Sequence, residues 1–243
     1  MEGPSIHLIA EELQIFVNQK VKDCLGNSHF DKEHLIGQKI EEIYAWGKRL
    51  IIQLEHDVIA THFLMYGSYR IDEERLDKPI RFAIITSKNA YYSYNCSVKC
   101  FPATDIKKYI DFELDILSDV WNIKKVINLI RKNPDSTIDD VLLDQNIFAG
   151  VGNIIKNEAL FTSRLLPSAV VKNLTLKKIK ELAINTRLFS LKFLELRKTF
   201  ELKKNLEIYR KPTCPVCGSK VVRQKTGKRN RWSFFCPKCQ KIK

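Results

Sequence analysis

The chain has 243 residues, of which 44% are hydrophobic and 10% aromatic, a composition that indicates a globular protein and excludes a disordered one. No apolar run is long enough to cross a bilayer and the first residues lack the regions of a secretory signal, so we expect an intracellular, soluble protein without a membrane partner. Residues 197–243 carry 15 Lys and Arg against 2 Asp and Glu, which equals the whole net charge of +13 and favours a polyanionic partner such as nucleic acid.

Apolar side chains recur at mostly helical spacing over residues 5–20, which predicts an N-terminal helix. Short segments rich in β-branched and aromatic residues follow and predict a β-sandwich or barrel. They are residues 50–54, 58–63, 82–86 and 90–94. From residue 118 the spacing is helical again, and helices are expected at 120–132, 137–143, 156–161 and 175–199. Strand-like pieces at 221–223 and 232–235 close the chain, so the predicted fold class is α+β.

Four of the seven cysteines form two closely spaced pairs near the end of the chain. They are Cys214 and Cys217, then Cys236 and Cys239, and 18 residues separate the pairs. Each pair places two thiolates on one tight turn, and two such turns complete a tetrahedral site for one Zn²⁺ ion. A site with four thiolates has no open position, so the ion is expected to be structural. A pair of redox dithiols is the alternative interpretation, which two such turns in one basic segment make less favourable.

A glycine-rich turn precedes the helix expected at 156–161. Residues 142–153 read LLDQNIFAGVGN, and Gly150 and Gly152 permit a tight turn with outward-pointing amides. Together with the positive end of the following helix, these amides form an anion site suited to a DNA phosphate, to which Asn153 is also expected to donate. The alternative is that the glycines only cap a helix.

The turn at 142–153 and the cysteine hairpin, which ends CPKCQ, resemble the corresponding motifs of the formamidopyrimidine-DNA glycosylase / endonuclease VIII family. Gly47-Lys48, the string HFLMYG at 62–67 and Glu2-Gly3-Pro4 resemble further family motifs, in family order over essentially the whole chain. The resemblance implies a DNA-repair protein with three domains. They are an N-terminal β-sandwich catalytic domain with a leading helix at 1–117, a helical domain with a helix–two-turn–helix at 118–205, and a zinc finger at 206–243.

The resemblance also implies a catalytic set at the N-terminus. Family members use the α-amine of an N-terminal proline, whereas aligning Glu2 with the family's glutamate puts Met1 at the proline position. Met1 is then expected as nucleophile, because an α-amine with a pKa of about 7.7–8 is partly neutral near pH 7 and can form a Schiff base. Glu2 is the expected acid and Lys48 the lysine beside the lesion phosphate. The alternative, without the proline, is a non-catalytic binder of damaged or abasic DNA.

The family's DNA contacts map onto three further regions of the chain. Asn153, Gly152 and Arg231 are expected to hold the phosphate of a flipped nucleotide, with Arg229 as the substitute if the hairpin register is shifted. Leu64, Met65 and Tyr66 resemble the plug that fills the hole left by the flipped base, although core packing in a strand is the alternative. No Arg-x-Phe wedge, which the formamidopyrimidine branch carries, occurs near residues 95–105. Its absence favours oxidised pyrimidines, abasic sites and single-stranded DNA as ligands. The protein is expected to be a monomer. Cytoplasm or nucleoid is the expected location in a bacterium, and the nucleus in a eukaryote.

Overall fold

The computed structural model describes residues 1–242, which divide into two compact units. Unit 1 consists of Met1 and residues 5–111, and unit 2 consists of residues 2–4 together with the chain from residue 112 onwards. The first residues of the chain are therefore shared between the units. Among residues 1–242, no helix has the length and apolar character that crossing a membrane requires.

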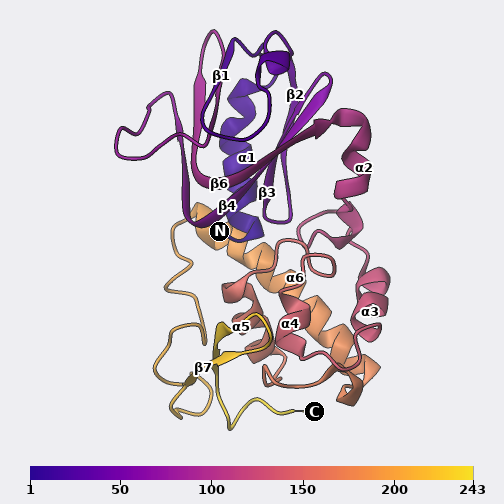
Figure 1. The fold of residues 1–243 in the computed structure, drawn as a ribbon. Helices are drawn as coiled ribbons and strands as arrows, with labels where there is room; N and C mark the ends of the chain where they lie inside the picture. The colour runs from indigo at the N-terminus through magenta and orange to yellow at the C-terminus, as the bar shows by residue number, and fades with distance from the viewer. Residues whose placement is uncertain (243) are drawn as a thin grey trace. The chain divides into compact units, whose positions relative to one another are not determined.

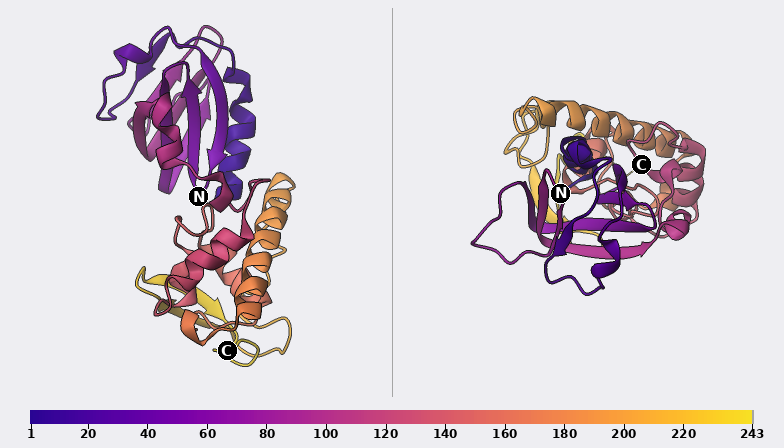
Figure 2. Two further views of the ribbon diagram at one scale, coloured as in Figure 1. Left: turned by 90° about the vertical axis from the view of Figure 1, so that its right-hand side faces the viewer. Right: turned by 90° about the horizontal axis from the view of Figure 1, so that it is seen from above.

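Unit 1 is a six-stranded antiparallel sheet with a helix beside it (Figures 1 and 2). The helix is α1 (Gly3–Glu12), and the strand order is β1-β5-β6-β4-β3-β2. The strands are β1 (Asp23–Leu25), β2 (Ile40–Trp46), β3 (Arg49–Leu54), β4 (Asp57–Ile71), β5 (Phe82–Ile85) and β6 (Ala90–Pro102). The four strand segments expected between residues 50 and 94 are confirmed as β3 to β6. The two long strands, β4 and β6, pair from Asp57 opposite Pro102 to Ile71 opposite Tyr91.

The helix of unit 1 is shorter than its apolar pattern indicates. Ile6, Ile9 and Ala10 of α1 are buried against the sheet residues, as the i, i+3, i+4 spacing requires. The chain continues only as a 3₁₀ turn (Leu13–Phe16), and Asn18 adopts a φ of 69°. The predicted helix over 5–20 is therefore wrong in its second half, because the backbone turns away before residue 18.

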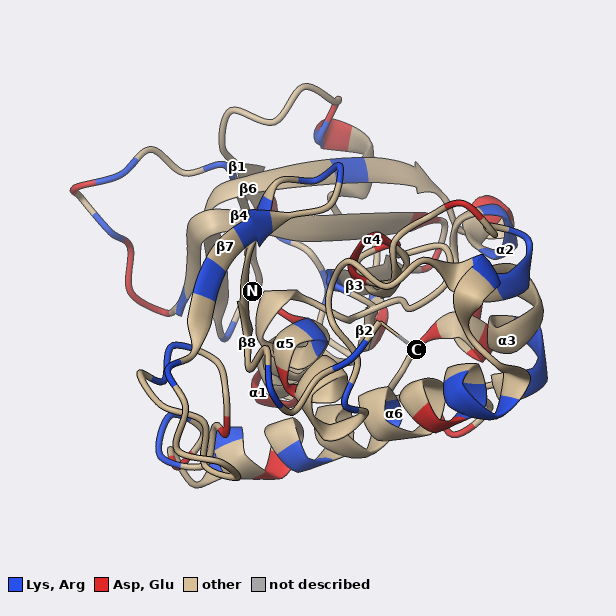
Figure 3. Ribbon diagram, turned by 90° about the horizontal axis from the view of Figure 1, so that it is seen from below, with Lys and Arg blue, Asp and Glu red and all other residues tan. Residues whose placement is uncertain are grey.

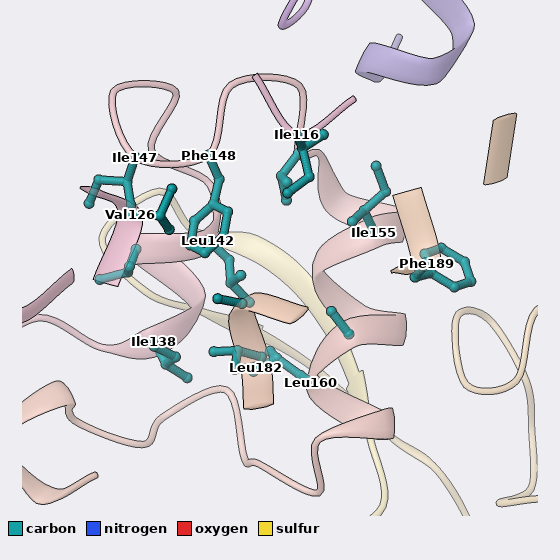
Figure 4. Packing of buried hydrophobic residues seen from close by; sticks show 14 of the residues in the cluster. Ile116, Val126, Ile138, Leu142, Ile147, Phe148, Ile155, Leu160, Leu182 and Phe189 are labelled. Carbon is teal, nitrogen blue, oxygen red and sulfur yellow. The ribbon is translucent and has the colours of Figure 1, made fainter. Parts of the chain in front are cut away.

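A short helix, α2 (Ile106–Tyr109), lies at the end of unit 1, and unit 2 contains four helices around its own core (Figure 4). The helices of unit 2 are α3 (Ile123–Arg131), α4 (Ile138–Leu142), α5 (Asn153–Thr162) and α6 (Leu176–Lys198). Leu142, Phe148 and Ile155 are fully buried in this core, which also includes Leu160 and Leu182. The four helices expected after residue 118 are confirmed as α3 to α6.

A two-stranded hairpin ends unit 2. β7 (Val222–Thr226) pairs antiparallel with β8 (Arg231–Phe235), with Thr226 opposite Arg231. Lys and Arg residues, blue in Figure 3, recur along β7 and the turn after it. Phe234 of β8 is buried beside Cys214 and Cys236 in a small separate core, which attaches the hairpin to the cysteine cluster.

Candidate active site

The first turn of α5 binds the carboxylate of Glu2. The N-cap residue of α5, Gly152, has no side chain to accept the unpaired N–H groups of that turn. The Glu2 carboxylate accepts them, with Oε1 2.6 Å from Ile154 N and Oε2 3.2 Å from Ile155 N. The helix dipole also favours a negative charge there. Two amides of the helix end that the sequence predicts as a site for a DNA phosphate therefore bind the Glu2 carboxylate.

The glycine-rich turn allows the N-terminal segment to approach. Gly150 has a φ of 101°, its N–H donates to Gln145 Oε1 at 3.1 Å, and its carbonyl accepts from Gly3 N at 2.9 Å. A Cβ atom on Gly152 would lie 2.3 Å from Cδ of Glu2, which is far inside van der Waals contact. Glycine at position 152 is therefore explained by the Glu2 side chain packed against it.

Asn153 connects α5 to the hairpin. Its Nδ2 donates to the carbonyl of Trp232 at 2.9 Å, and Asn157 one turn later accepts from Phe234 N at 2.7 Å. The Oδ1 atom of Asn153 is buried without a hydrogen-bond partner among residues 1–242. Arg231, exposed at the start of β8, is the residue before Trp232. Asn153 and Arg231, predicted from distant parts of the sequence, are thus brought to adjoining positions.

A buried polar network under the hairpin was missed by the sequence analysis. Lys156 is fully buried, and its Nζ donates to Ser233 Oγ at 2.7 Å. Thr226 Oγ1 lies 2.5 Å both from Ser233 Oγ and from Oδ2 of Asp139, which is also buried. Burial lowers the pKa of Lys156 to about 8, against the opposing effect of the Asp139 charge. A lysine within the apolar run of a helix is the sequence signal that could have identified this network.

The hairpin turn is attached to α4 by hydrogen bonds from its backbone N–H groups to the side chain of Asp140. Asp140 accepts from Lys228 N at 2.9 Å and from Arg229 N at 3.4 Å. A Cβ atom on Gly227 would lie 2.5 Å from Asp140 Oδ1, so the turn packs closely on this carboxylate. Arg229 is exposed within the turn, whereas Arg231 opens the strand that carries the Asn153 contact.

The four cysteines of the two CxxC pairs meet at the base of the hairpin. Sγ atoms of Cys214 and Cys239 are 3.8 Å apart, those of Cys217 and Cys236 are 3.5 Å apart, and all four lie within 4.8 Å of one another. Hydrogen bonds from Ser219 lower the pKa of Cys217 to about 6, which favours its thiolate. The predicted convergence of these cysteines is confirmed, in a geometry that fits a metal ion.

In unit 1, positive groups gather around His62. Gly47, with a φ of 54°, forms the turn between β2 and β3 that carries Lys48, and Arg49 pairs with His62 across β3 and β4. Burial lowers the pKa of His62, and the charges of Arg49, Lys48 and the α-ammonium of Met1 lower it further. Lys48 and the N-terminal amine therefore share one electropositive region, in which His62 is a further candidate that the sequence analysis quoted only as part of a motif.

The predicted plug residues lie on a bulge in the long strand β4. The register of β4 against β6 shifts over this stretch, and Tyr66 has a φ of 68°. Asn95 Nδ2 donates to the carbonyl of Met65 at 2.7 Å and holds the bulge in place. The exposed fractions are 43% for Leu64, 63% for Met65 and 82% for Tyr66. These side chains therefore project from the sheet and do not pack in its core.

Comparison with known proteins agrees with this arrangement. Residues 2–97 match the formamidopyrimidine-DNA glycosylase N-terminal domain, and residues 113–195 match the formamidopyrimidine-DNA glycosylase H2TH domain. Formamidopyrimidine-DNA glycosylase of Haemophilus influenzae (strain PittEE) is 30% identical over 226 residues, which are 84% of this chain and 82% of that protein. The chain belongs to the formamidopyrimidine-DNA glycosylase / endonuclease VIII family.

Relatives of the endonuclease VIII branch are also similar. Endonuclease 8-like 3 of Xenopus laevis is 36% identical over 229 residues, which are 90% of this chain and 37% of that protein. The human Endonuclease 8-like 3 is 40% identical over 203 residues, which are 80% of this chain and 33% of that protein. This chain thus spans about a third of the length of these two relatives.

Solved structures share the fold. A viral DNA glycosylase superposes with a TM-score of 0.86 at 24% identity, covering 99% of this chain and 100% of that one. Formamidopyrimidine-DNA glycosylase of Lactococcus lactis, non-covalently bound to DNA that contains an AP site, superposes with a TM-score of 0.87 at 22% identity over 99% of both chains.

Proposed function

We propose that this chain is a DNA glycosylase with AP lyase activity that acts on damaged DNA through the α-amine of Met1. The observation that carries the proposal is the binding of the Glu2 carboxylate to the first turn of α5. That contact fixes an acid beside Asn153, and the α-amine of Met1 is only one residue away along the chain. An amine and a carboxylate in adjoining residues supply the nucleophile and the proton carrier that excision of a base requires.

The proposed reaction needs only groups of the chain, the substrate and water. The neutral amine nitrogen of Met1 forms a bond to C1′ of the deoxyribose as the bond between C1′ and the base breaks, and the base leaves with the bonding electrons and takes a proton from water. Glu2 accepts a proton from that nitrogen and passes it to O4′ as the sugar ring opens, which leaves a protonated Schiff base. The iminium then withdraws electrons, so that C2′ loses a proton to water and the bond between C3′ and the phosphate oxygen breaks, which expels the 3′ phosphate. Hydrolysis of the Schiff base by water then releases the amine.

The phosphate beside the damaged nucleotide is the proposed ligand of Asn153 and Arg231. The Asn153 side chain uses one N–H on Trp232 and keeps polar capacity for a ligand, and Arg231 is exposed at the adjoining end of β8. A guanidinium binds phosphate oxygens in a bidentate manner. Lys48, in the electropositive region of unit 1, is proposed to contact the DNA backbone, and Gly152 and Arg229 remain proposed DNA contacts.

The four-cysteine cluster at the base of the hairpin is proposed to hold one Zn²⁺ ion. With Zn–S bonds of about 2.3 Å, a tetrahedral site separates its sulfur atoms by about 3.8 Å, and the observed separations of 3.8 and 3.5 Å fit that value. When bound, the ion supplies folding energy to the hairpin and no chemistry. The bound ion would make the hairpin rigid, so that β8 holds Arg231 in a fixed orientation.

Oxidised pyrimidines, abasic sites and single-stranded DNA are the proposed ligand classes. The exposed side chains of Leu64, Met65 and Tyr66 could enter the space that a flipped base leaves, which supports a flipping mechanism. The excess of Lys and Arg in residues 197–243 supplies attraction to phosphates that does not depend on sequence.

Borohydride trapping on a duplex with one abasic site tests the proposal. Mass spectrometry first confirms the N-terminal residue, and peptide mapping then locates the adduct. The expected result is a covalent adduct at Met1, which Glu2→Gln should form more slowly. An adduct at Lys48, or none despite tight DNA binding, contradicts the proposal; the surface variant Lys20→Ala is the matched control and should trap like the unaltered chain.

The second candidate function is a non-catalytic binder of damaged or abasic DNA. The observation that favours it is that both carboxylate oxygens of Glu2 accept backbone N–H groups of α5, a role that organises the turn without chemistry. Absence of any adduct, together with binding that prefers abasic over intact duplex, would establish this function.

A further inference from the structure

Unit 1 contains a second group of metal-ligating side chains, remote in sequence from the four cysteines. His34 lies in a 3₁₀ turn (Glu33–Leu35), Asp57 is the first residue of β4, and Cys100 is near the end of β6. Because β4 and β6 are antiparallel, the start of one lies beside the end of the other, with Cys100 opposite Ile59. One ligand atom from each of the three residues lies within 4.8 Å of the other two.

The spacing of these atoms suits a metal ion better than a hydrogen bond. Asp57 Oδ1 is 3.5 Å from Nε2 of His34 and 4.0 Å from Sγ of Cys100. A good N–H···O bond is shorter, at about 2.9 Å. The edges of a tetrahedron around zinc measure about 3.3 Å between nitrogen and oxygen and about 3.5 Å between sulfur and oxygen, so small adjustments bring all three atoms to bonding distance.

Gln38 orients one ligand in the way that outer-shell partners do at metal sites, and Asp31 lies close enough to His34 to do the same once an ion binds. Gln38 Nε2 donates to Oδ2 of Asp57 at 2.7 Å, which leaves Oδ1 to face His34 and Cys100. Asp31 Oδ2 lies 3.7 Å from Nδ1 of His34, the nitrogen that points away from the group. A carboxylate behind a histidine fixes the ring and its tautomer in such sites.

We propose that His34, Asp57 and Cys100 form a site for one divalent transition-metal ion of the zinc class, separate from the four-cysteine cluster. Imidazole, thiolate and carboxylate together select zinc over the calcium or magnesium that oxygen ligands prefer. His34 is 43% exposed, so an ion enters from solvent and water completes its coordination. The ion joins the turn at 33–35 to the adjoining ends of β4 and β6, the two central strands, and so stabilises this end of the sheet.

The test measures zinc per chain by mass spectrometry of the metal, after the full chain has been equilibrated with micromolar ZnCl₂ and gel-filtered. His34→Ala and Cys100→Ser are each expected to contain one ion fewer than the unaltered chain. Cys96→Ser is the matched control, because Cys96 is a buried cysteine on the same strand outside the group, and it should keep the full content. The difference between variants does not depend on whether the four-cysteine cluster is loaded.

A titration with Zn²⁺ adds a readout that misfolding would not produce. Asp31→Asn keeps all three ligands and is expected to weaken the site by about tenfold or more, as loss of an outer-shell partner does. In chains whose four-cysteine cluster is already loaded, His34→Ala should remove the further increase in melting temperature that Zn²⁺ gives to the unaltered chain. Equal zinc content and equal melting shifts in the unaltered chain, His34→Ala and Cys100→Ser would overturn the proposal.

Discussion

Gly152→Ala should separate Glu2 from α5. The added Cβ atom would lie 2.3 Å from Cγ and Cδ of Glu2 and 2.7 Å from its Oε1. The backbone of Gly152 has a φ of −122°, an extended conformation that alanine adopts without strain. The substitution therefore acts through the Glu2 side chain, which must leave its place.

The magnitude follows from the two hydrogen bonds that Glu2 makes to Ile154 and Ile155. Bonds to a charged acceptor contribute about 1.5–3 kcal/mol each, and partial solvation reduces their sum, so we expect a loss of about 2–4 kcal/mol. In a chain that already carries Glu2→Ala, the Cβ atom of Gly152→Ala has no Glu2 carboxylate to displace. Its cost should then fall to about 1 kcal/mol or less, the difference between glycine and alanine at a helix N-cap.

Urea unfolding of the four chains of this double-mutant cycle measures the coupling. The expected coupling energy between positions 2 and 152 is about 2 kcal/mol. If Gly152→Ala cost the same with and without the Glu2 side chain, the explanation of this glycine would be wrong. The rate of borohydride trapping on abasic DNA should fall with Gly152→Ala as well, since the acid is displaced.

Three further substitutions test other parts of the structure. The buried Lys156 has a pKa lowered from 10.5 to about 8, so between these pH values the unfolded chain binds a proton that the folded chain does not. The free energy of unfolding should therefore rise by about 3 kcal/mol between pH 8 and 10.5. Lys156→Met should remove that rise when denaturation is measured as a function of pH. Met65→Ala, at an exposed position, should change the free energy of unfolding by less than about 0.5 kcal/mol yet weaken binding to abasic duplex in a fluorescence titration; equal affinity would contradict its role as a plug. Cys214→Ser should lower the zinc content and weaken DNA binding together, and unchanged values of both would contradict a structural zinc.

Local signals in the sequence predict much of the fold. The spacing of apolar residues predicts α3 to α6, and runs of β-branched and aromatic residues predict β3 to β6, because each pattern reports the face that an element buries. The two CxxC pairs predict that the four cysteines meet, because each turn holds two sulfur atoms close together and a tetrahedral metal site needs four.

Contacts between distant segments could not be predicted in this way. Glu2 binds amides that are more than 150 residues away, and nothing in residues 142–153 indicates which anion occupies them. Lys156 pairs with Ser233 through the packing of the hairpin on α5, which no helical pattern contains. Asp57 and Cys100 come together through the register of β4 and β6, and the separate turn at 33–35 brings His34 to them.

The proposed role of the α-amine is tested most directly by placing one alanine before Met1. The extension moves the amine by one residue and leaves Glu2, Asn153, Arg231 and the cysteines unchanged in sequence. Cleavage of an oligonucleotide with one oxidised pyrimidine should slow by about 100-fold or more, which corresponds to about 2.7 kcal/mol of lost transition-state stabilisation, while affinity for abasic duplex stays within about twofold. Cleavage at the rate of the unextended chain would contradict catalysis by the N-terminal amine.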